Sequence, residues 1–110
     1  MNEKKVTING HELSVVFNMA VEIEYEDISG QPFDIPSMTT QKATMQLCFA
    51  SLKVANGKLP FTFDELKKSI SVEEWLALKD TVIALMTEWF HIPAVMKEEN
   101  QNEEETEKNS

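Results

Sequence analysis

The sequence contains no arginine, and all ten of its basic residues are lysines. Acidic residues outnumber them, so the formal net charge is −9 at pH 7. Arginine is the preferred residue for bidentate contacts with phosphates and base edges. Binding to nucleic acid or to an anionic membrane also requires a basic surface. We therefore expect neither nucleic acid nor a membrane as a partner.

Cysteine and long apolar runs are scarce as well. Cys48 is the only cysteine, so no disulfide can form within the chain. No apolar run approaches the roughly 20 residues of a membrane-spanning helix. Polar residues within positions 9–12 interrupt the stretch that a signal peptide would need. With 110 residues, of which 42% are hydrophobic, the chain is predicted to form one cytoplasmic domain.

Motifs for catalysis or ligand binding are missing from the pattern. The three glycines form no phosphate-binding loop, and His11 and His91 belong to no metal-ligand spacing. Cys48 falls within an apolar helical stripe, which favours a buried side chain over a nucleophile. The carboxylates within residues 22–27 spread around a helix and do not converge on an ion. We therefore predict no enzyme activity, metal, cofactor or small-molecule substrate.

The first elements are predicted to be a β-hairpin and two helices. Apolar and polar residues alternate over residues 5–17, around Asn9-Gly10. This dipeptide favours a type I′ turn, in which both central residues need a positive φ. Asn18 and Gly30 are suited to begin and end the first helix. An apolar stripe with three- and four-residue steps predicts the second helix over about residues 39–55.

Two capping boxes mark the starts of two further helices. In each box a hydroxyl residue is followed three positions later by Glu, so that the two side chains satisfy free N–H groups of the first helical turn. They predict a short helix over residues 63–69 and a long one over about residues 72–91. The two boxes are Thr62 with Glu65 and Ser71 with Glu74.

The last segment of the chain, residues 97–110, differs in composition from the rest. It has six Glu, two Lys and no aliphatic or aromatic residue, so burial cannot offset the entropy of ordering it. The complete pattern predicts an α+β, mainly α fold. It comprises an N-terminal β-hairpin and about four helices in a single domain over residues 1–96, followed by a disordered acidic tail over residues 97–110.

The long helix has an unusually wide apolar face. Its apolar residues cover about half the circumference, whereas a typical surface helix needs a stripe a little over about 100° wide. One side is predicted to contact the core and the other a partner chain; alternatively, the domain wraps its longest helix on several sides. The central Lys79 would either reach solvent or pair with a carboxylate. The candidate protein-interaction face comprises Trp75, Leu78, Lys79, Val82, Met86, Trp89 and Phe90.

The order of these features resembles the small tail assembly chaperones of long-tailed, siphovirus-type bacteriophages. The resemblance covers roughly residues 5–92. After the hairpin, three segments carry the resemblance: an acidic-aromatic helix over residues 17–30, a helix around Leu47–Leu52, and the helix start Thr62–Leu66. It implies a mostly helical fold, self-association and binding of the tape measure protein before the tail tube polymerises. It implies no cofactor and no catalytic residue.

Three functional hypotheses follow. The first is a phage or prophage tail assembly chaperone that binds the tape measure protein and keeps it soluble in the bacterial cytoplasm during tail morphogenesis. The second is another phage structural or head–tail connector component that also acts through protein–protein interaction. The third, a small-molecule-binding or enzymatic domain, would need a deep polar pocket for which the sequence offers no evident residues.

Overall fold

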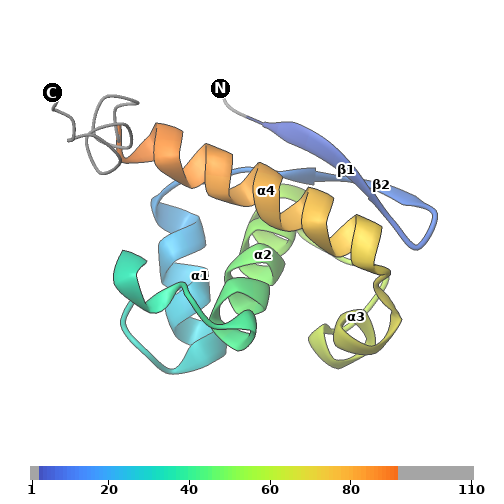
Figure 1. Cartoon of the computed structure of the whole chain (residues 1–110), viewed down its shortest axis with the longest axis horizontal. Helices are drawn as coiled ribbons and strands as arrows, with labels where there is room; N and C mark the ends of the chain where they lie inside the picture. Colours follow the sequence, from blue (N-terminus) through green and yellow to red (C-terminus); the bar gives the residue numbers. More distant parts are fainter. Residues whose placement is uncertain (1–2, 92–110) are drawn as a thin grey trace, which may run out of the picture.

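The computed structural model describes residues 3–91 and has the predicted α+β, mainly α architecture. An antiparallel hairpin is followed by four α-helices (Figure 1). The predictions for the tail over residues 97–110, and for the end of the domain at residues 92–96, concern positions outside the described residues. The elements are β1 Lys4–Ile8, β2 His11–Val15, α1 Met19–Ser29, α2 Gln41–Asn56, α3 Phe63–Ser69 and α4 Val72–Trp89, with a short 3-10 turn, η1, at Ile35–Ser37.

The hairpin forms around the predicted turn. Asn9 has a φ of 52° and Gly10 a φ of 83°, as a type I′ turn requires. Val6 pairs with Leu13 across the ladder. This register turns the apolar side chains of the hairpin towards α2 and α4, where Ile8 is completely buried.

The free edge of β2 is covered by side chains of α2. The hydroxyl of the buried Ser51 accepts a hydrogen bond from Val16 N at 3.0 Å and donates one to Val16 O at 2.7 Å. The Asn56 amide makes a similar pair of bonds, accepting from Ser14 N at 3.1 Å and donating to Ser14 O at 2.8 Å. These bonds satisfy backbone groups that a two-stranded sheet would leave without partners.

Three helices, α1, α3 and α4, begin directly after their predicted capping residues Asn18, Thr62 and Ser71, whereas α2 begins at Gln41, two residues after the predicted start at about residue 39. Asn18 and Thr40 cap α1 and α2, and complete capping boxes open α3 and α4. Gly30 ends α1 in the left-handed conformation. The long helix ends at Trp89, two residues before the predicted limit, and η1 occupies part of the predicted loop.

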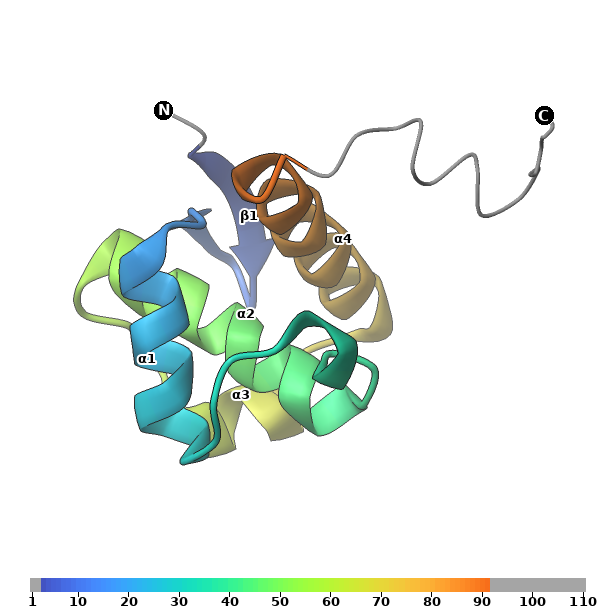
Figure 2. The same cartoon turned by 90° about the vertical axis from the view of Figure 1, so that its left-hand side faces the viewer.

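The core lies where α1, α4 and the hairpin meet α2. In Figure 1, α4 crosses the molecule and α2 passes beneath it between α1 and α3; Figure 2 shows α1 in the foreground and the start of α4 at the back. None of the helices within residues 3–91 combines the length and apolar character needed to cross a membrane. The fully buried side chains include Ile8, Val15, Val21, Leu47, Leu52, Leu66, Leu78 and Val82.

Candidate protein-interaction site

The middle of the predicted interaction face belongs to the domain's own core. Leu78 and Val82 are completely buried, and Met86 is only 5% exposed. They are covered because α4 packs against both α2 and β1. The apolar pattern of a single helix does not show where these two neighbouring elements lie. These three residues therefore stabilise the fold and offer no surface to a partner while the domain stays folded.

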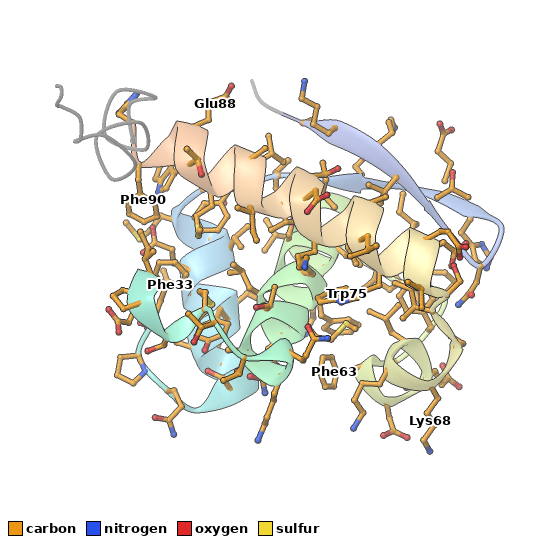
Figure 3. The ribbon with its side chains drawn as sticks, viewed as in Figure 1. Phe33, Phe63, Lys68, Trp75, Glu88 and Phe90 are labelled. Carbon is orange, nitrogen blue, oxygen red and sulfur yellow. The ribbon has the colours of Figure 1, made fainter. Side chains whose placement is uncertain are left out.

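Trp75 and Lys79 lie at the margin of this core. The half-buried Trp75 packs against the core and borders a small depression with Met45 of α2 and Val72; in Figure 3 it points towards α3. Lys79 is also half-buried, and no carboxylate among residues 3–91 forms an ion pair with it. The positive charge of Lys79 therefore lies at the edge of an apolar surface, and no carboxylate of residues 3–91 pairs with it.

The C-terminal end of α4 does expose the predicted aromatic residues. Trp89 and Phe90 are each 37% exposed. The Trp89 indole Nε1 donates a hydrogen bond to Glu22 Oε2 of α1 at 3.0 Å. The Phe90 ring stacks on Phe33, with centroids 6.0 Å apart and planes inclined by 3° (Figure 3). These contacts fix the two aromatic side chains while leaving part of each ring exposed, and we call the pair the aromatic end.

Among residues 3–91, four large apolar side chains outside the predicted face are more exposed than Trp89 and Phe90. Met19 and Ile23 lie one turn apart on α1, and Val72 and Leu76 lie one turn apart on α4. The predicted interaction face lies wholly on α4 and just after its end, and it includes neither pair. A search for i, i+4 apolar pairs outside each core stripe would have found both pairs.

The environment of Cys48 is that of a structural side chain. It is fully buried on α2, as its place in the apolar stripe predicts. Burial raises the pKa of the Cys48 thiol far above its ordinary value of 9.0, while the positive charge of Lys79 has a smaller, opposite effect. The thiol is therefore protonated and shielded near neutral pH.

The described residues also form depressions that are open to solvent. Within residues 3–91, no three or more His, Cys, Asp or Glu side chains gather in a way that could hold a metal ion. His11 and His91 are both exposed, one at the hairpin turn and the other just after α4. A solvent-open depression of about 510 Å³ lies between α1, η1 and α2, with Asp34 and Lys42 among its lining residues.

Within residues 3–91, the exposed apolar features suited to binding lie on α1 and at the two ends of α4. They are the aromatic end of α4 and the two exposed pairs on α1 and α4. Comparison with known proteins adds no assignment, because no protein-family model, curated protein or solved structure matches this chain.

Proposed function

We propose that this protein is a phage or prophage tail assembly chaperone that binds the tape measure protein in the bacterial cytoplasm, self-associates and performs no catalysis. The observation that carries the proposal is the combination of exposed apolar side chains with a net charge of −9. The order of the hairpin, helices and capping boxes, on which the family resemblance rests, supports it as well.

The physical task of such a chaperone matches this combination. A tape measure protein is a long helical chain with apolar stripes, and it must remain soluble until tube subunits cover it. Exposed apolar residues provide contacts for those stripes, and a high net charge keeps the complex from associating with other complexes. In this proposal the chaperone provides both properties through one small domain.

We place the client contact at the aromatic end of α4. Tryptophan and other large rings contribute most of the binding energy in many interfaces, particularly where their position is fixed before binding. Trp89 is held by Glu22, and Phe90 is stacked on Phe33. The exposed parts of both rings can therefore bind an apolar helix without first losing side-chain freedom.

Co-expression tests the function directly. The protein is produced together with the candidate tape measure protein encoded immediately downstream, and the soluble fraction and co-purification of the client are measured. We expect the client to become soluble and to co-purify. Phe90→Glu should weaken the complex, whereas the adjacent His91→Glu should not, because His91 lies outside the aromatic stacking; circular dichroism confirms that both variants fold.

A client that is equally soluble and unbound with or without this protein would refute the chaperone function. Recovery of the protein from purified phage particles would then favour a structural or connector component. If the client binds the Phe90→Glu and His91→Glu variants equally well, the function stands but the aromatic end is not its site.

A further inference from the structure

Two short apolar strips on different helices are left exposed by the packing of residues 3–91. The α1 strip contains Met19 and Ile23, which are 55% and 53% exposed, and the α4 strip contains Val72 and Leu76, which are 70% and 46% exposed. In Figures 1 and 2, α1 and the start of α4 lie towards opposite ends of the molecule. The strips therefore do not cover each other within one copy of the chain.

The two strips have the same spacing and end in opposite charges. On α1, Met19 is followed by Ile23 after four residues and by Glu26 after three more. On α4, Val72 is followed by Leu76 and then Lys79 at the same intervals. Residues at three- and four-residue steps share one face of a helix. Two such helices aligned in parallel would place apolar residues opposite apolar residues and Glu26 opposite Lys79.

The charges distinguish this arrangement from parallel pairing of two identical strips, and the mixing experiment below tests the antiparallel symmetric alternative. Lys79 is the only basic residue of α4, and it has no ion-pair partner in the described part of the chain. A parallel pair of α4 strips would bring the two copies of Lys79 together, and a pair of α1 strips would bring together the carboxylates of Glu26 and Asp27. Pairing of α1 with α4 instead joins opposite charges, which favours specific contact between two otherwise acidic molecules.

We propose that the α1 strip of one copy packs on the α4 strip of the next copy, with Glu26 facing Lys79. One Glu26 oxygen, Oε2, accepts a hydrogen bond from Phe33 N at 2.8 Å, which positions the carboxylate and leaves Oε1 for the lysine. Because each copy carries both strips, the contact is head-to-tail and can repeat. The proposal gives a residue-level basis to the self-association included in the proposed function.

The contact is small, so assembly depends on protein concentration. Two strips of about two turns bury less than the roughly 1,200–2,000 Å² typical of a stable interface. Sedimentation velocity over a micromolar concentration series should therefore show association of the wild-type chain. Ile23→Glu and Leu76→Glu should each abolish it, since each places a carboxylate in one strip. Ala77→Glu is the matched control, because Ala77 is exposed on α4 outside the strip, and it should assemble like the wild type.

Mixing the two blocked variants provides the decisive measurement. Ile23→Glu retains an intact α4 strip and Leu76→Glu an intact α1 strip, so an equimolar mixture should form 1:1 dimers and nothing larger. The Lys79→Glu variant should associate about tenfold or more weakly than the wild type, because it loses a paired charge in the interface. Met19→Glu and Val72→Glu replace the first pair if circular dichroism shows that either variant is unfolded.

Several outcomes would overturn the proposal. A monomeric wild type at high micromolar concentration would show that no second copy binds, including the case in which the chain's own C-terminal segment occupies a strip. Loss of association in only one blocked variant would indicate symmetric pairing, and blocked variants that fail to recombine would exclude the α1–α4 contact. A variant that is monomeric but still solubilises the client separates this interface from the chaperone function, which the co-expression assay judges independently.

Discussion

Replacing Ser51 by alanine should destabilise the fold more than its size suggests. Ser51 is completely buried, and its hydroxyl bonds both Val16 N and Val16 O. In Ser51→Ala the two backbone groups remain buried without partners, and each unsatisfied group costs about 1–3 kcal/mol. We expect a loss of about 2–4 kcal/mol in the free energy of unfolding, and a fall in Tm on the order of 10–20 °C for a domain of this size.

Urea denaturation followed by circular dichroism measures this loss, and Ser69→Ala is the matched control. The Ser69 hydroxyl also makes two hydrogen bonds, to Asn9 Nδ2 and Glu65 O, but it is exposed, so water can replace them. The control should lose less than about 1 kcal/mol. A Ser51→Ala variant within about 1 kcal/mol of the wild type would refute the reasoning, because it would show that the edge of β2 does not depend on this hydroxyl.

Three further predictions use the same assays. Gly10→Val should destabilise the fold by about 1 kcal/mol or more, because the residue has a φ of 83°. Asn9→Asp should have little effect, and equal, negligible effects of both substitutions would argue against the importance of the turn. A chain ending at Met96 should melt within a few degrees of the full-length chain, since the removed residues are strongly polar; a large loss would mean that they dock. Above about pH 9, stability should fall because the Cys48 thiol, whose pKa burial raises, stays protonated only in the folded state; an identical pH dependence in Cys48→Ala would contradict this.

The elements that could be predicted from the sequence are those determined by neighbouring residues. The hairpin follows from the conformational preferences of Asn9 and Gly10, and the helix starts follow from side chains that bond the N–H groups of the next turn. These interactions span at most a few positions along the chain. The positions of the turn and of these helix starts can therefore be predicted from nearby residues, and the predicted positions agree with the structure.

The arrangement of those elements depends on contacts between distant positions. Ser51 looks like an ordinary helical serine in the sequence, yet it bonds Val16, which lies 35 residues away. Likewise, the sequence of α4 predicts a wide apolar face. The positions of α2 and β1 determine which of its residues are covered, so that Leu78 is buried and Leu76 is exposed. For this reason the sequence predicted that α4 is broadly apolar without separating its core residues from its surface residues.

The exposed apolar residues belong to a chain with a high net charge. Apolar surface drives association without regard to partner, whereas a net charge of −9 makes most encounters between copies repulsive. Association is then favoured only where the local charges are complementary as well as the apolar surfaces. In the proposed α1–α4 contact, Lys79 would provide that exception beside Leu76 on α4, a helix that carries four carboxylates. A lysine in the wide apolar face, unfavourable for simple burial, is therefore well suited to select one contact among many possible ones.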